Sequence, residues 1–248
     1  MPGNDASTIS NSGIEQRMSV LADIRHAVTN VAALQHESPA VVLRRRVVVS
    51  MVLVVGAGLL GAALTRRPTE SSFYWLTLVL VVVWTVGSVM SGPLHLGGIT
   101  WQGRNQRPVI TGSVIGLLLG GVFVLAGLVA KRIPVVSDQI TQVLRYADQG
   151  SWRLILAIAL VGAIAEELVY RGALYTALGR HSPALLSTIV YVSVTMVSGN
   201  VMLGVAAIVL GTVCAGERRS TGGVLAPVMT HFVWTLVVVL ALPPVFGL

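Results

Sequence analysis

The sequence is poor in charged residues, which make up only 11% of its 248 residues, against about 25% in a typical soluble domain. It contains a single cysteine, Cys214, which excludes an internal disulfide and any multi-cysteine metal site. The first 40 residues lack a basic segment followed by an apolar one, so no cleavable signal peptide is apparent. In contrast, 54% of the residues are hydrophobic and the mean hydropathy is +0.80. This composition predicts an all-α, polytopic transmembrane helix bundle.

The net charge of +7 would point to nucleic acid if the protein were soluble. Here most Lys and Arg residues lie in short segments between apolar runs, where such residues set membrane topology and contact anionic lipids. We therefore expect a lipid bilayer, and no nucleic acid, as the surroundings of this chain.

Residues 1–40 are predicted to be a polar cytoplasmic tail, and residues 41–248 a transmembrane domain. Between Leu21 and Val31 apolar residues recur at helical spacing, which fits either an amphipathic helix on the membrane surface or a solvated tail with some helicity. A span needs roughly 20 apolar residues, and we predict about seven spans (six to eight): 47–65, 73–92, 109–130, 153–178, 183–199, 201–215 and 223–243. The fifth and sixth are short and are separated by Gly199-Asn200, so they form either a tight hairpin or a partly re-entrant helix.

The Lys and Arg residues between the predicted spans favour a cytoplasmic N-terminus. With that orientation ten of them lie inside and six outside. Trp75, Trp101 and Trp152 lie near the ends of apolar runs, where interfacial aromatic residues are expected. These features predict a multi-pass protein of the cell membrane.

Three glycines, Gly112, Gly116 and Gly120, recur every four residues in the third run. On a helix they form a flat strip along which another helix can approach closely. Packing within the chain is the favoured interpretation, and a dimer interface is the alternative.

Two adjacent carboxylates, Glu166 and Glu167, lie inside the fourth apolar run. The other acidic residues fall in the tail or in predicted loops, as Asp138 and Glu217 do. Burying one carboxylate in a bilayer costs at least about 2.5–3.5 kcal/mol, and adjacent carboxylates repel each other when both are ionised. Arg171, four residues after Glu167, is the expected partner on the same helical face. Glu166 then faces elsewhere, which suits a general base acting on water; a helix-end salt bridge is the alternative.

Polar groups on two later runs are candidates to face this pair. His231 lies within the last apolar run, and Thr235 follows one turn further on the same face. On the fifth run Tyr191 and Thr195 are also one turn apart, although such hydroxyls commonly bond to helix carbonyls.

The segment EELVYRG, followed by the late His231, resembles the CPBP intramembrane peptidases, the CAAX-protease and bacteriocin-processing group also called Abi. Their pattern is EExxxR, then FxxxH, then HxxxN or HxxxD on successive helices. The first element is complete, whereas Tyr191 and Thr195 replace the Phe and His of the second. Thr235 replaces the Asn or Asp of the third. The resemblance covers roughly residues 150–238.

The resemblance implies a glutamate-dependent intramembrane endopeptidase that acts on a peptide or lipidated protein near the cytoplasmic face. Carried over by position, Glu166 would activate water, Glu167 and Arg171 would hold the charge and geometry of the site, and His231 with Thr235 would stabilise the oxyanion. The family's middle histidine has no equivalent, because Thr195 cannot take up a proton at neutral pH.

Two further interpretations stay open at this stage. The replacements at Thr195 and Thr235 fit a catalytically inactive relative that acts as a membrane binding or immunity factor. Intramembrane acids also serve ion-coupled transporters, although inverted repeats are not visible in the sequence. No cofactor is expected, and zinc is disfavoured because adjacent glutamates on one helix diverge and HExxH is absent.

Overall fold

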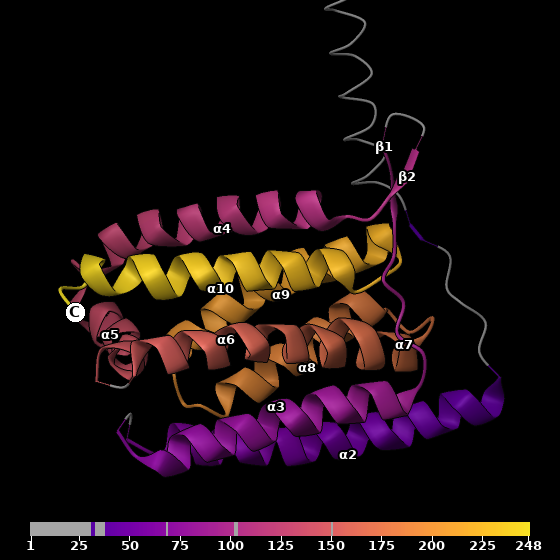
Figure 1. Ribbon diagram of the computed structural model, residues 1–248, viewed down its shortest axis with the longest axis horizontal. Helices are drawn as coiled ribbons and strands as arrows, with labels where there is room; N and C mark the ends of the chain where they lie inside the picture. The colour runs from indigo at the N-terminus through magenta and orange to yellow at the C-terminus, as the bar shows by residue number, and fades with distance from the viewer. Residues whose placement is uncertain (1–30, 33–37, 68, 102–103, 150) are drawn as a thin grey trace, which may run out of the picture.

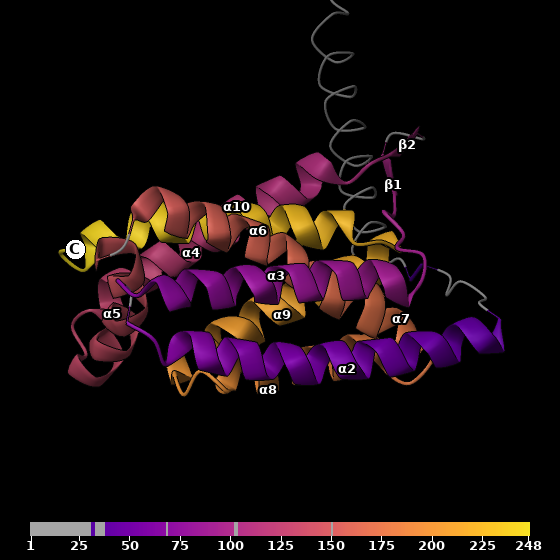
Figure 2. The same cartoon turned by 60° about the horizontal axis from the view of Figure 1, so that its bottom comes forward.

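A computed structural model describes residues 31–32, 38–67, 69–101, 104–149 and 151–248. Most helices run roughly parallel or antiparallel to one long axis (Figures 1 and 2). The predicted all-α bundle is confirmed. The elements are α2 (Pro39–Leu64), α3 (Ser71–Ser91), β1 (Ile99–Trp101), β2 (Arg104–Gln106), α4 (Val109–Ala130), α5 (Pro134–Gln149), α6 (Trp152–Glu167), the π-helix η1 (Leu168–Leu174), α7 (Tyr175–Leu178), α8 (Pro183–Met196), α9 (Val201–Thr221) and α10 (Leu225–Val245).

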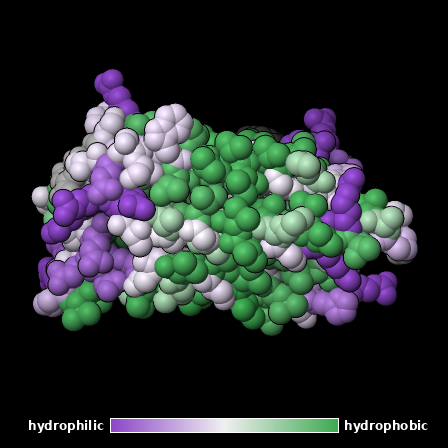
Figure 3. All heavy atoms as spheres, turned by 90° about the horizontal axis from the view of Figure 1, so that it is seen from below, coloured by the Kyte–Doolittle hydropathy of each residue, from purple (hydrophilic) through white to green (hydrophobic). Residues whose placement is uncertain are grey.

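Five of these helices, α2, α3, α4, α9 and α10, are long and apolar enough to cross a membrane. Figure 3 shows a broad hydrophobic belt on one face of the bundle, with hydrophilic residues gathered at its two ends. In water such a belt would cost a large amount of free energy, whereas in lipid it is solvated. The chain is therefore a multi-pass membrane protein, and seven remains the predicted number of spans.

The predicted short fifth and sixth runs form a tight helical hairpin, one of the two expected arrangements. α8 and α9 pack against each other, and Gly199 in the connection has a φ of +72°, a value that glycine adopts at little cost. Asn200 caps α9 by accepting from the backbone N–H of Leu203 at 3.1 Å. Its amide also donates to the carbonyl of Gln139 at 2.7 Å, which ties this connection to α5.

The segments between predicted spans contain more structure than we expected. Residues 134–149 form the amphipathic helix α5 and not a loop, so Asp138 lies on a helix. α5 lies transverse to the other helices at one end of the bundle (Figures 1 and 2). At the other end β1 and β2 form a short antiparallel hairpin. The predicted tail helix around 21–31 falls almost entirely outside the described residues.

The predicted fourth span changes its helix type halfway along. α6, η1 and α7 run continuously from Trp152 to Leu178, with π-helical hydrogen bonding from Leu168 to Leu174. π-helical turns are rare and often mark functional sites. The change begins directly after Glu167, so both glutamates lie at the junction and Arg171 lies within the π-helix.

The glycine strip of α4 packs against α10, which confirms the favoured interpretation of packing within the chain. A Cβ atom on Gly112 would lie 2.5 Å from the carbonyl oxygen of Ala226, and one on Gly116 would lie 2.5 Å from that of Thr230. Gly112 also accepts a hydrogen bond from the hydroxyl of Thr230 at 2.9 Å. This close approach fixes the helix that carries His231.

Replacing Gly116 with Leu is expected to destabilise the protein by at least about 2 kcal/mol, because the new side chain would collide with the α10 backbone. Gly121 on the same helix is the matched control, since a Cβ there meets no atom within 4 Å. Gly121→Leu should shift stability by less than about 0.5 kcal/mol. Thermal unfolding in detergent measures both, and equal shifts would contradict the packing described.

Candidate active site

A fully buried ion pair forms the base of the candidate site. Nη1 of Arg171 donates to Oε1 of Glu167 at 3.1 Å, and neither side chain is exposed. This is the pairing that their spacing predicted, and it survives in the π-helix because residues four apart are still close there. Nη2 of Arg171 donates to the carbonyl of Gly211 on α9 at 3.0 Å. The guanidinium thus joins the glutamate helix to α9.

His231 brings α10 to both glutamates. Its Nδ1 lies 2.8 Å from Oε1 of Glu167, so with a proton on Nδ1 the ring donates to that carboxylate. Its Nε2 lies 4.0 Å from Oε2 of Glu166. That separation is too long for a direct hydrogen bond, and one bridging water or substrate oxygen fits it.

The two glutamates have different surroundings. Glu167 is completely buried and accepts from both Arg171 and His231. The side chain of Glu166 is 25% exposed and interacts with the hydroxyl of Tyr191 on α8. The carboxylate of Glu167 is thus occupied by Arg171 and His231, whereas the carboxylate of Glu166 remains accessible from outside the protein.

Tyr191, which the sequence offered only as a hydroxyl on the fifth run, lies beside Glu166 in the structure. Its ring also lies under the guanidinium of Arg171, at 4.8 Å from the ring centre, a favourable cation–π distance. The sequence placed Tyr191 where the family has Phe, but its contact with Glu166 depends on the rotation of α8. A tyrosine hydroxyl adds a hydrogen-bond donor that Phe lacks.

Neither Thr195 nor Thr235 makes a described contact with the glutamates. Thr235 is buried on α10, one turn beyond His231. Thr195 donates to the backbone carbonyl of Tyr191 at 2.9 Å, the common behaviour of a helical threonine. Among the described contacts, none links Thr195 to Glu166 or Glu167.

Glu217 corrects the expectation that Glu166 and Glu167 are the only acids within the helices. It lies in α9 and not in a loop, and it is 8% exposed. Its Oε1 lies 2.7 Å from the hydroxyl of Thr230, which also contacts the carbonyl of Gly112. A hydroxyl donates only one proton, so both contacts are satisfied when Glu217 is protonated and donates to Thr230. Glu217 therefore acts as a structural link among α4, α9 and α10.

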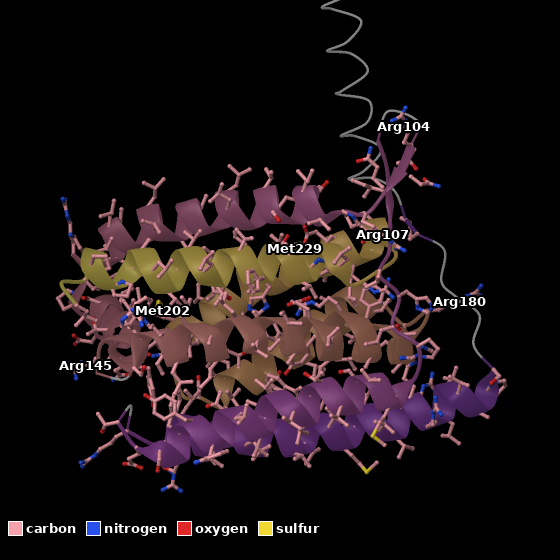
Figure 4. All side chains as sticks on the ribbon, viewed as in Figure 1. Arg104, Arg107, Arg145, Arg180, Met202 and Met229 are labelled. Atoms are coloured by element: carbon pink, nitrogen blue, oxygen red, sulfur yellow. The ribbon has the colours of Figure 1, made fainter. Side chains whose placement is uncertain are left out.

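His181, which closely follows the fourth predicted span, does not supply the histidine that the family has in its second motif. It is exposed in the turn after α7, where its Nδ1 contacts the carbonyl of Leu178 at 3.1 Å. Figure 4 places the neighbouring Arg180 at the same end of the bundle as Arg104 and Arg107, opposite Arg145.

Metal binding receives no support from the described side chains. Within the described ranges, no group of three or more His, Cys, Asp or Glu residues is arranged to hold a metal ion. Glu166, Glu167 and His231 converge, but the last two already bond to each other at 2.8 Å. The arrangement suits proton transfer and hydrogen bonding.

Comparison with known proteins gives a match over the part of the chain that holds this site. Residues 148–237 match the family model described as type II CAAX prenyl endopeptidase Rce1-like. No curated protein and no solved structure matches the chain significantly. The matched segment includes Glu166, Glu167, Arg171 and His231. Residues 148–237 thus match the Rce1-like group of the CPBP family, the resemblance that the EExxxR motif and the late histidine predicted.

Proposed function

We propose that this protein is an intramembrane endopeptidase of the CAAX-protease type, in which Glu166 activates water. The observation that carries the proposal is the asymmetry of the glutamate pair. Glu167 is buried and paired, whereas Glu166 is partly exposed and faces Nε2 of His231 across 4.0 Å. The carboxylate of Glu166 is therefore accessible to a substrate, and the imidazole of His231 lies next to it.

In the proposed reaction Glu166 takes a proton from a water molecule placed between its carboxylate and His231. The water oxygen bonds to the carbonyl carbon of the substrate, and the resulting oxyanion accepts a hydrogen bond from Nε2–H of His231. Because Nδ1–H donates to Glu167, this role requires the His231 ring to carry a proton on both nitrogens. The C–N bond then breaks, and Glu166 returns its proton to the leaving amine. Glu167 and Arg171 do not react; they hold His231 and balance the buried charge.

We propose that the substrate enters from the cytoplasmic side. Glu166 lies just past the midpoint of the continuous helix from Trp152 to Leu178, slightly nearer the end that carries Arg104, Arg107 and Arg180 (Figure 4). With the orientation favoured by the basic residues, that end is cytoplasmic. We propose a bacterial plasma membrane as the location and a peptide or lipidated protein as the substrate.

The proposal is tested by incubating protein reconstituted in liposomes with prenylated and unmodified peptides and identifying products by mass spectrometry. We expect cleavage close to the C-terminus of at least one peptide class, and the same rate in the presence of EDTA, since water is activated by a carboxylate. Activity that EDTA abolished and zinc restored would contradict the proposed chemistry. Absence of cleavage across all peptide classes would favour an inactive relative.

Tyr191→Phe is expected to lower the rate of cleavage by about tenfold to a hundredfold, because Glu166 loses a charge-assisted hydrogen bond of about 1.5–3 kcal/mol. Thr195→Val is the matched control on the same helix, since the Thr195 hydroxyl bonds to its own helix backbone. It should change the rate by less than about threefold. The reverse order of effects would place Thr195, and not Tyr191, beside the reacting groups.

A further inference from the structure

A cavity of about 870 Å³ lies at the end of the bundle that we assign to the cytoplasm. It is bounded by the start of α2, by the turn between α7 and α8, and by the C-terminal end of α9. It lies apart from the glutamate pair, which does not line it. The cavity is lined by basic arginine side chains and by apolar side chains of α2 and α8.

The polar part of the cavity is strongly basic. Four arginines line it: Arg46 from α2, Arg180 from the α7–α8 turn, and Arg218 and Arg219 from α9. None of the described residues that line the cavity is Asp or Glu. Four positive charges around one space raise the local concentration of anions.

Of the four arginines, Arg218 gives the strongest indication of an anion site, because its side chain is buried, with an exposed fraction of only 9%. Its Nε donates to the carbonyl of Arg171 at 2.7 Å, and its guanidinium lies 4.9 Å from the ring centre of Tyr175. Among the described residues, no carboxylate lies within ion-pair distance of it, and the adjacent Glu217 bonds to Thr230 instead. A buried cation without a counter-ion is costly in a membrane protein, so a bound anion would stabilise it.

Arg46 is held in a comparable way. Its Nε donates to the carbonyl of Ala177 at 3.2 Å. In both Arg46 and Arg218 a backbone carbonyl accepts from Nε. Nη2 of Arg218 also donates to the hydroxyl of Thr176 across a long 3.5 Å, and the remaining Nη hydrogens can serve the cavity. A guanidinium held in this manner is well suited to bind the oxygens of a phosphate.

The apolar part of the cavity points to a lipid and not to a soluble anion. Val42, Ala184 and Leu185 line it. Val42 lies in the first turn of α2, and Ala184 and Leu185 lie in the first turn of α8. Leu185 is 61% exposed and so faces the bilayer. A phosphate at the arginines would leave an attached acyl chain beside these residues.

We propose that this cavity binds the phosphate of an anionic phospholipid headgroup, with an acyl chain along the start of α2 and α8. The site requires neither the glutamate pair nor peptidase activity. Binding would fill the space between three segments that meet at this end of the bundle and neutralise Arg218, so it would also stabilise the fold.

The proposal is tested by native mass spectrometry of the full-length protein in detergent, titrated separately with phosphatidylglycerol, phosphatidylcholine and glycerol phosphate. We expect phosphatidylglycerol to bind at least about tenfold more tightly than the other two. Arg46→Gln and Arg180→Gln should each weaken its binding by about tenfold, the effect of losing one charge-assisted hydrogen bond. Neither substitution touches the proposed catalytic groups, so peptidase activity need not be measured.

Two matched controls separate a defined site from general surface charge. Arg44 lies beside Arg46 on α2, and Arg104 lies at the same end of the bundle (Figure 4), but neither lines the cavity. Arg44→Gln and Arg104→Gln should bind phosphatidylglycerol as the wild type does. Equal losses in all four variants would overturn the proposal, as would glycerol phosphate binding as tightly as the lipid. Preferential binding of a peptide with a free C-terminal carboxylate would overturn it too, in favour of a substrate site.

Discussion

Purified protein in which Glu166 is replaced by Gln is expected to hydrolyse its peptide substrate about 10²–10⁴ times more slowly than the wild type. Gln has nearly the same shape and can keep the contact with Tyr191, but it cannot take up a proton from water. The loss should therefore appear in kcat and leave substrate binding nearly unchanged.

Two further variants make this result specific to Glu166. Glu166→Asp keeps the carboxylate but withdraws it by one methylene group, so we expect an intermediate loss of roughly 10²-fold from misplacement. Asp138→Asn removes an exposed carboxylate from α5 and should leave the rate unchanged. Thermal unfolding of all three variants checks that each is folded. A folded Glu166→Gln protein that cleaved at the wild-type rate would exclude Glu166 as the base.

Replacing Arg171 with Leu is expected to destabilise the protein by about 3–5 kcal/mol, the usual cost of breaking a fully buried ion pair. The substitution removes the 3.1 Å contact with Glu167 and the 3.0 Å contact with the carbonyl of Gly211. It leaves Glu167 buried, with His231 as its one remaining described hydrogen-bond partner. Unfolding in detergent, followed by heat or denaturant, measures the change.

The double variant Glu167→Leu/Arg171→Leu separates the ion pair from simple loss of packing. If the main cost is an uncompensated charge, the double variant will be more stable than Arg171→Leu alone. Arg180→Leu, at an exposed position, should change stability by less than about 0.5 kcal/mol. Additive losses in the double variant would show that the two side chains do not interact energetically.

Much of the architecture could be predicted because apolar runs of span length have few alternatives to helix in a membrane. The same argument failed for α5, since we counted apolar runs and this helix is amphipathic. A signal was nevertheless present: Val136, Ile140, Val143 and Leu144 recur at helical spacing, and Leu144 is buried. Packing of the α4 glycine strip within the chain was predictable because glycines four residues apart let another helix approach closely, although the sequence did not identify α10 as that helix.

Residue spacing alone could predict the candidate site only where its residues are close in sequence. The pairing of Glu167 with Arg171 follows from a spacing of four, and the role of His231 followed from the family resemblance. Tyr191 reaches Glu166 through the rotation of α8, which one sequence does not reveal. Glu217 was assigned to a loop because two arginines follow it, although Leu210, Cys214 and Glu217 continue one helical face.

Glu166 is proposed to activate the water that hydrolyses peptide bonds in the membrane. A decisive experiment compares the membrane peptides of cells that produce the wild-type protein with those of cells that produce equal amounts of Glu166→Gln. We expect at least one membrane-associated peptide or lipidated protein to be shortened in the wild-type cells and to accumulate uncut in the variant cells. Identical peptide profiles in the two cell populations would contradict the account.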